Sequence, residues 1–409
     1  MIFLVTVLYV ISILTSALQA HPGHEAPMNI FVGIIEPQET LVEVAQGVAE
    51  HLAYSKQFVV TCLPVEFPKS KQDVTKLFDS GYPLALFISQ EKGSQAILWR
   101  LYDATRGVMC KGKRYDYNGL LPHHIAQTIA HDVWFEMTGE FSSFSSCISY
   151  IKKNKTKTTS TYNLCLMDYN GKHNKVLYAT QRIIIVPAWN NDIKKLHIVF
   201  SEFTPYNVRL LAIDMQGKLR SVLDADGTYA GVAYAHKGKD VVYCRSGEVW
   251  HYHYDQDQKK GIHELIIQDD ETCASPNITV EGDVIYCSQG KVKYYKKSNK
   301  SITIVTPEGY CVAPTYTSCG NKIAYSRRMR EHMQLFVHDT GAGTHRQITF
   351  DKGDKTDSSW SPCGNYLAFV YIEKGLSQIG IIHVKTGARY MVTSPLENCS
   401  YPSWSPFLQ

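Results

Sequence analysis

A block of apolar and polar residues with nearly constant spacing recurs along the second half of the chain. Each copy centres on an aromatic or bulky apolar anchor residue, and successive anchors are 45, 44, 38, 44 and 44 residues apart. In four copies a glycine stands four residues after the anchor, which suits a tight turn, and a following apolar run predicts the next strand of a hairpin. The anchors are Trp189, Tyr234, Ile278, Tyr316, Trp360 and Trp404, and the glycines are Gly238, Gly282, Gly320 and Gly364.

Two further strands complete each copy, as in the β-rich runs at 333–350 and 377–394, where Thr, Gly and polar residues mark the turns. Four strands in about 44 residues are typical of one β-propeller blade. No long apolar stripe of helical period occurs from residue 145 onward, so the pattern argues against stacked helical repeats.

The two ends of the repeat region complement each other. Residues 146–180 supply strands two, three and four of a blade without its first strand, and residues 400–409 supply a first strand alone. Pairing the two pieces removes exposed strand edges. We therefore predict a six-bladed propeller over 145–409, closed by pairing of the strand around Trp404 with the strand at 148–151.

The segment 21–140 follows a different pattern, in which short apolar runs alternate with amphipathic stretches. This alternation predicts a small N-terminal α/β domain before the propeller. Strands are expected at 28–35, 83–89 and 96–104, and helices at 40–55 and 121–139, the last with Pro122 near its start and Gly139 beyond its end.

Residues 1–20 form an apolar run with small residues near its end, followed by a polar, proline-containing segment. This pattern predicts a signal peptide that is removed near Ala17 or Ala20, and hence an exported protein. No Lys or Arg occurs before Lys56, so the usual positively charged start is missing. An uncleaved membrane anchor is therefore the alternative interpretation.

Composition and charge limit the partners. The net charge is +4 over 409 residues, and the basic stretches at 152–157 and 291–300 fall in predicted turns or edges, so nucleic acid is not expected as a partner. Eleven cysteines are unusual for an exported chain, and because the number is odd at least one of them has no partner for a disulfide. Equivalent positions on neighbouring blades also stand too far apart for a bridge. We expect mostly free, buried thiols with at most one bridge.

The segment 131–151 resembles the TolB family of periplasmic propeller proteins. The family has there an Asp, an apolar pair, Thr-Gly and a Phe before an Ile-Ala-Tyr strand, and the matching residues are Asp132, Thr138, Gly139, Phe144, Ile148 and Tyr150. Further similar sequences are RLYD (100–103), WSPCG (360–364) and PSWSPFL (402–408). The chain departs from the family at Ser142, where Gly is common, at Cys147, where Arg is common, and in blades without a Ser-Pro-Asp-Gly turn.

The resemblance implies a periplasmic component of the Tol-Pal cell-envelope system, with roles in envelope integrity and cell division. It implies a peptidoglycan-associated lipoprotein as partner at the propeller face and channel. A TolA-like, inner-membrane-anchored protein is the implied partner of the N-terminal segment. The resemblance implies no cofactor, no small-molecule substrate and no enzymatic activity.

A metal-dependent propeller enzyme acting on a saccharide is the alternative function. His251 and His253 share one face of a predicted strand and could ligate a metal together with a third ligand, but the sequence identifies no third ligand. The G-x-S-x-G nucleophile motif of hydrolase domains is also absent. We therefore expect neither a metal site nor catalytic residues.

Loops that lead into the anchor strands rim one mouth of a propeller channel, and loops on a rigid scaffold often carry binding residues. Tyrosine is favoured at such interfaces because it buries a large area and keeps a polar group. The candidate partner-binding residues at this mouth are Thr228, Tyr229, Thr272, Tyr310, Asp357, Ser358, Asn398 and Tyr401.

Overall fold

The computed structural model describes residues 27–116, 119–190, 192, 195–222, 229–235, 240–255, 260–279 and 281–408. The predicted signal peptide, Gly238 and Thr228 lie outside the described residues. The chain divides into two compact units between Ser145 and Ser146. Among the described residues, no helix combines the length and apolar character needed to cross a bilayer.

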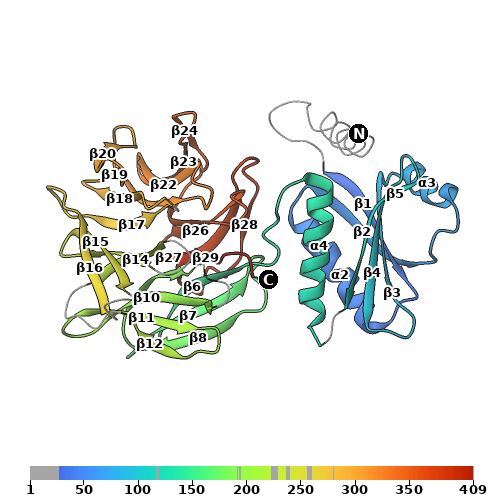
Figure 1. The fold of residues 1–409 in the computed structure, drawn as a ribbon, viewed down its shortest axis with the longest axis horizontal. Coiled ribbons are helices and arrows are strands. Elements are labelled where there is room, and N and C mark those ends of the chain that lie inside the picture. The colour runs from blue at the N-terminus through green and yellow to red at the C-terminus, as the bar shows by residue number, and fades with distance from the viewer. Residues whose placement is uncertain are drawn as a thin grey trace. The chain divides into compact units, whose positions relative to one another are not determined.

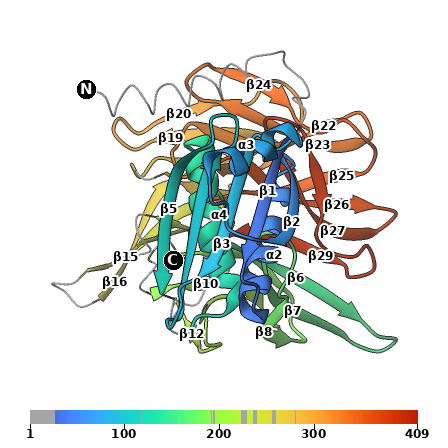
Figure 2. The same cartoon turned by 90° about the vertical axis from the view of Figure 1, so that its right-hand side faces the viewer.

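The N-terminal unit is built on one five-stranded sheet. Its strand order is β2-β1-β3-β4-β5, with β1 parallel to β2 and β3 and the remaining pairs antiparallel. Figure 2 shows this sheet from the front, with β5 on the left and β2 on the right. The elements are β1 (Met28–Ile35), α2 (Glu39–Tyr54), β2 (Phe58–Val65), α3 (Lys71–Asp79), β3 (Leu84–Gln90), β4 (Ala96–Asp103), β5 (Val108–Asp116) and α4 (Pro122–Thr138).

Helix packing covers one face of this sheet, as Figure 1 shows for α2 and α4. The two helices cross closely at Gly47, where an added Cβ would lie 2.7 Å from the Cβ of Ala126. On the other face Phe31 and Phe87 pack against Leu77 of α3. The α/β architecture and the predicted strands and helices are confirmed, and β2, α3 and β5 are additional elements.

The second unit is a six-bladed propeller, and each blade is a four-stranded antiparallel sheet. Its first three complete blades consist of β9 (Ile184–Trp189), β10 (His197–Phe203), β11 (Val208–Asp214) and β12 (Leu219–Ser221); β13 (Tyr229–Ala235), β14 (Asp240–Arg245), β15 (Glu248–Asp255) and β16 (Lys260–Ile267); and β17 (Ala274–Ile278), β18 (Val284–Ser288), β19 (Lys291–Lys296) and β20 (Ser301–Ile304). The next two consist of β21 (Cys311–Tyr316), β22 (Lys322–Met329), β23 (His332–Asp339) and β24 (Thr344–Gln347), and of β25 (Asp354–Trp360), β26 (Tyr366–Glu373), β27 (Leu376–His383) and β28 (Arg389–Met391). The ring of blades is visible in Figure 1.

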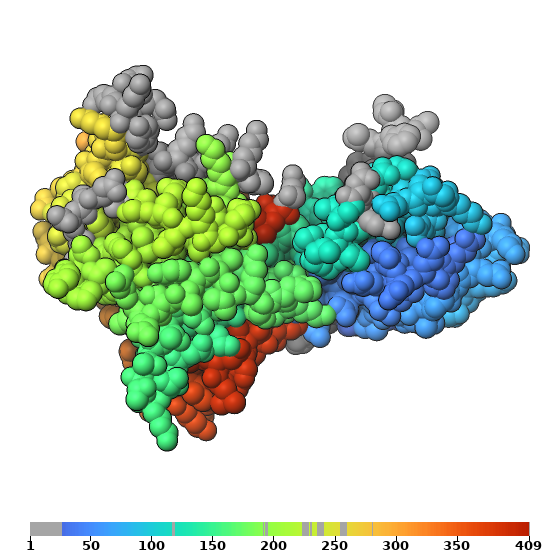
Figure 3. Space-filling view, turned by 90° about the horizontal axis from the view of Figure 1, so that it is seen from below, coloured from blue at the N-terminus to red at the C-terminus, as the bar shows by residue number. Residues whose placement is uncertain are grey.

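The sixth blade joins the two ends of the propeller chain. Strand β29 (Cys399–Trp404) pairs antiparallel with β6 (Cys147–Lys155), which is followed by β7 (Ser160–Asp168) and β8 (Lys175–Thr180). Trp404 lies opposite Ile148, and Ser400 lies opposite Ile151. The predicted closure is therefore confirmed, and Figure 3 shows the red C-terminal region against the green strands of this blade.

Free cysteines occur throughout the chain. All eleven thiols are unbridged, and six of them are buried. Burial raises the pKa of the buried Cys244 and Cys399 thiols to about 12, which keeps both in the protonated, unreactive form at neutral pH. These cysteines therefore act as small apolar residues of the propeller core.

Candidate functional site

A cavity of about 510 Å³ lies along the inner strands of the propeller. All six inner strands contribute to its wall, together with turns that follow them, such as those at Ser318, Pro362 and Phe407. The anchors Trp189, Tyr234, Ile278, Tyr316, Trp360 and Trp404 all line it. Every blade therefore contributes to the channel wall.

Each inner strand carries a β-bulge at the same place, three residues before its anchor. The bulged residue has a φ between 48° and 63°, a conformation that glycine adopts easily and other residues rarely. Only one of the six is glycine. The bulged residues are Val186, Gly231, Ser275, Ala313, Asp357 and Tyr401, and all of them line the channel.

An aromatic residue of the partner strand stands opposite each bulge. This residue is fully or almost fully buried in every blade, so the bulge lies beside the packed interior of the blade. Such packing can maintain a backbone conformation that costs about 1 kcal/mol or more. The six aromatic residues are Phe200, Tyr243, Tyr286, Tyr325, Phe369 and Tyr150.

Anchor tryptophans connect neighbouring inner strands. The indole Nε1 of Trp189 donates to the carbonyl oxygen of Ser403 at 3.0 Å, and that of Trp360 donates to the carbonyl oxygen of Thr315 at 3.3 Å. The backbone N–H of Trp404 donates to the Ser359 hydroxyl at 2.9 Å. These bonds fix the channel wall as a preformed surface rather than a flexible one.

Strand β25 differs from the other inner strands because it carries two charged residues after its first residue. Lys355 is completely buried, five residues before the anchor. Its ammonium group donates to the carbonyl oxygens of Asp351 and Lys352 at 2.6 Å and of Gly353 at 3.0 Å, and it lies 3.2 Å from the Asp351 carboxylate. The three carbonyls use all three ammonium donors.

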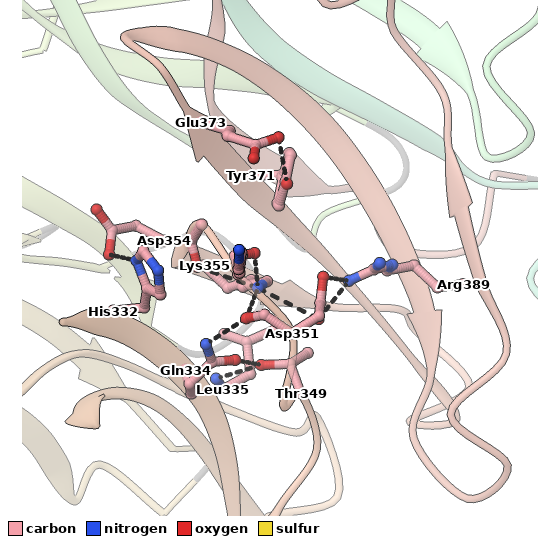
Figure 4. Close-up of polar contacts among 12 residues, drawn as sticks. His332, Gln334, Leu335, Thr349, Asp351, Asp354, Lys355, Tyr371, Glu373 and Arg389 are labelled. Atoms are coloured by element: carbon pink, nitrogen blue, oxygen red, sulfur yellow. Dashed lines mark hydrogen bonds and ion pairs between the residues drawn. The ribbon is translucent and has the colours of Figure 1, made fainter. Parts of the chain in front are cut away.

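Arg389 extends this network to the outer strand of the same blade, as Figure 4 shows. Its guanidinium contacts both carboxylate oxygens of Asp351 at 2.9 Å. Burial lowers the pKa of Lys355, and the Asp351 carboxylate opposes that shift. The loop before β25 is therefore wrapped around a fixed positive charge.

Asp357 is the only charged residue among those that the structure shows lining the channel. Thr356 donates a hydrogen bond to its carboxylate at 3.1 Å, and no described residue forms an ion pair with it. Burial deep in the channel raises the pKa of the Asp357 carboxyl, although the side chain remains partly accessible to the cavity. Burial also raises the pKa of Tyr401, and the nearby Asp357 charge raises it further.

Ser358 follows Asp357 in the channel wall. Its hydroxyl is buried and has no hydrogen-bond partner among the described residues. A buried hydroxyl without a hydrogen-bond partner lowers the stability of the folded state. Such groups often form a hydrogen bond to a bound ligand or water molecule. Asp357 and Ser358 together give β25 a charged and polar stretch in the channel wall, whereas the neighbouring inner strands contribute no charged residue to it.

The candidate residues proposed from the sequence fall into three groups. Asp357, Ser358 and Tyr401 lie within inner strands rather than in loops and line the channel. Thr272 and Tyr310 are exposed immediately before inner strands. Of the remaining residues, Asn398 accepts a hydrogen bond from Ser377 at 2.8 Å. Tyr229 is 1% exposed, with its ring against Tyr243. Thr228 lies outside the described residues.

Sequence reasoning did not single out the bulges or Lys355. A signal for the bulges was present, because proline stands two residues before the anchor in four repeats, at Pro187, Pro276, Pro314 and Pro402. Aligning the repeats also places Lys355 in one column with Cys273, Cys311 and Cys399. A lysine in a column of buried cysteines marks a specialised blade.

The histidine pair of the alternative hypothesis lies on β15. The rings of His251 and His253 are 5.3 Å apart between centroids. No group of three or more His, Cys, Asp or Glu side chains suited to a metal occurs in the described part of the chain. The pair thus has no described third ligand.

The fold and the channel define a class of two-part proteins, in which a small α/β unit precedes a six-bladed propeller closed by its own ends. No protein-family model matches the chain. The Tol-Pal system protein TolB of Francisella tularensis subsp. mediasiatica is 22% identical over 320 residues, which cover 71% of this chain and 70% of the relative. The protein of the same name from Gluconobacter oxydans is 25% identical over 143 residues, 35% of this chain and 30% of the relative.

A solved structure shares the whole architecture. TolB from Acinetobacter baumannii superposes with a TM-score of 0.80 at 18% identity, covering 95% of this chain and 98% of that one. The sequence relatives and the shared fold together support a TolB-family assignment.

Proposed function

We propose that this chain is a periplasmic protein-interaction scaffold of a Tol-Pal cell-envelope system and not an enzyme. Its propeller binds a peptidoglycan-associated lipoprotein, and its N-terminal region binds a TolA-like protein. These contacts serve envelope integrity and cell division. The relatives named Tol-Pal system protein TolB support the system, and the preformed channel is the observation that carries the binding role.

Exposed apolar side chains favour one of the two ends of the channel as the place where the partner binds. The loops before the inner strands and the turns between second and third strands lie at the same end of an antiparallel blade. Among the described turns, large exposed apolar residues occur at this end and not at the opposite one. They are Ile183, Tyr206, Tyr310, Phe350 and Leu396, with exposed fractions from 46% to 95%. Exposed apolar residues at one end of the propeller favour that end as the interaction surface.

A channel-filling variant tests the proposal. Ser275→Tyr puts at one bulge the side chain that Tyr401 already carries at an equivalent bulge, so the fold can accommodate it. We expect this variant to lose capture of a lipid-free peptidoglycan-associated lipoprotein. Thr303→Tyr, on the exposed outermost strand β20, is the matched control and should bind normally. Normal capture by Ser275→Tyr would move the site away from the channel.

Cell fractionation tests the location. We expect the chain in the periplasmic fraction, with its first residues removed near Ala17 or Ala20, as mass spectrometry of the mature N-terminus would show. A TolA-like protein should be captured by the full mature chain and lost when residues 21–27, which precede β1, are deleted. Capture that survives this deletion would contradict the assignment of the N-terminal region.

A further inference from the structure

Five inner strands of the propeller follow one pattern, and β25 breaks it at three positions. At the place five residues before the anchor, the other strands have buried Ile184, Tyr229 or a cysteine, whereas β25 has Lys355. At the bulge and the next position, β25 has Asp357 and Ser358. In a ring of near-identical blades, local departures of this kind are expected where the function is located.

The positive charge of Lys355 is already used. Its three donors go to carbonyl oxygens of the preceding loop. The ammonium group also contacts the Asp351 carboxylate, which Arg389 holds as well, and lies 5.3 Å from the centroid of the Tyr371 ring. Lys355 therefore positions the start of β25 and leaves Asp357 without a cationic partner in the described structure. The channel thus presents one uncompensated carboxylate.

The surroundings of Asp357 favour a side chain over a metal ion as its partner. A protein site for a divalent cation usually needs several oxygen ligands, with more than one carboxylate in most cases. The described channel offers a single carboxylate, and the aromatic anchors Trp189, Trp360 and Trp404 line the same cavity. Aromatic faces and a carboxylate together suit a guanidinium or ammonium group on an aliphatic stem.

We infer that Asp357 receives one arginine or lysine side chain of the partner segment that enters the channel, with the Ser358 hydroxyl as a second polar contact. This inference rests on the proposed function, because it names the chemistry that the propeller recognises in its protein partner. The incoming cation pairs with a carboxylate that burial otherwise disfavours, so the contact gives specificity as well as affinity.

The test compares matched variants in calorimetric titration with a lipid-free peptidoglycan-associated lipoprotein. Asp357→Asn removes the charge and keeps an acceptor for Thr356, and Asp357→Ser introduces the residue that Ser275 provides at an equivalent bulge. Glu281→Gln removes one charge from an exposed turn after β17 and serves as control. We expect both Asp357 variants to bind at least about tenfold more weakly and the control to bind like the wild type.

A small-molecule competition identifies the chemistry of the inserted group. Acetyl-arginine amide at millimolar concentration should displace the lipoprotein and quench the channel tryptophans, whereas the neutral acetyl-citrulline amide should do neither. Equal competition by both compounds would overturn the inference. Near-ultraviolet circular dichroism confirms that each variant keeps its tertiary packing.

Three results distinguish the inference from the proposed function. If Asp357→Asn binds normally while Ser275→Tyr does not, the channel is the site and the cationic contact is wrong. If both variants bind normally, the channel hypothesis fails as well. If lipoprotein binding requires added Ca²⁺ and Asp357→Asn no longer takes up Ca²⁺, the carboxylate holds an ion, which also overturns the inference.

Discussion

The two units of this chain solve the problem of strand edges in opposite ways. The N-terminal sheet is open, with β2 and β5 as edge strands, and its core depends on helices packed against its faces. The propeller is a ring in which the last strand, β29, completes the blade begun by β6. Stability is therefore local in the first unit, whereas in the second it depends on contact between residues more than 250 positions apart.

This difference also determines where polar groups can be buried. The ring surrounds β25 with neighbouring blades on both sides, so Lys355 can be enclosed completely and satisfied by backbone carbonyls. The N-terminal unit has exposed ion pairs instead, as between Arg114 of β5 and Glu91 at 3.0 Å. Rigid enclosure allows the propeller to hold charges in fixed positions near its channel.

Opening the ring should have the largest effect. Deletion of residues 400–409 removes β29 and leaves an unpaired edge on β6, so we expect the propeller to lose its cooperative unfolding transition. Scanning calorimetry measures this loss. Deletion of residues 408–409 alone, beyond β29, is the control and should leave the transition in place. A wild-type transition in the longer deletion would show that closure contributes little.

Replacing the buried lysine should have the next largest effect. Lys355→Met keeps much of the volume but leaves three buried carbonyls without their donor and removes one of the two cations beside Asp351, which should lower the free energy of unfolding by about 3 kcal/mol. Urea unfolding measures the change. Lys352→Met, at an exposed neighbour in the same loop, should change it by less than about 0.5 kcal/mol. Equal effects of the two substitutions would contradict the role of the ammonium group.

Acidification should destabilise the propeller through His383. Burial lowers the pKa of His383 to about 4, and the charge of Lys385 contributes. Because the folded-state pKa lies below the unfolded value of 6.5, this group's contribution is complete above about pH 6.5 and is lost as the pH falls toward 4. The loss amounts to about 2 kcal/mol at pH 5.

Unfolding at several pH values tests this contribution. His383→Gln should flatten the dependence between pH 6.5 and pH 5, whereas substitution of the exposed His124 in the N-terminal unit should leave the propeller's dependence unchanged. An unchanged slope in His383→Gln would show that other groups dominate.

The sequence predicted the propeller more completely than the N-terminal unit, for a physical reason. Six copies of one blade let weak signals reinforce each other, so the anchors and the closing strand around Trp404 were found by comparing repeats. The strand β5 occurs once, has no apolar alternation because both of its faces are largely exposed, and was not predicted.

The channel wall was only partly foreseen. Asp357 and Tyr401 were singled out as loop residues, but the bulges place them inside strands. A bulge is a shift in the pairing of two strands, here opposite Phe369 and Tyr150, which the local sequence of one strand does not reveal. The Lys355 network likewise depends on Arg389 from another strand of the blade.

The smallest effect should come from the helix crossing of the N-terminal unit. Gly47→Ala places a Cβ 2.7 Å from the Cβ of Ala126, which is closer than Cβ atoms approach in folded proteins, so α2 and α4 must shift at this point. Such overpacking costs about 1–3 kcal/mol, and the better helix propensity of alanine returns about 0.5–1 kcal/mol. The net loss in the free energy of unfolding should be about 1 kcal/mol, confined to the N-terminal unit.

The double substitution Gly47→Ala with Ala126→Gly removes the close contact, so the two changes should be non-additive in urea unfolding. Additive losses would show that the helices do not touch at this point, and a shift in the propeller transition would contradict the local character of stability in this unit.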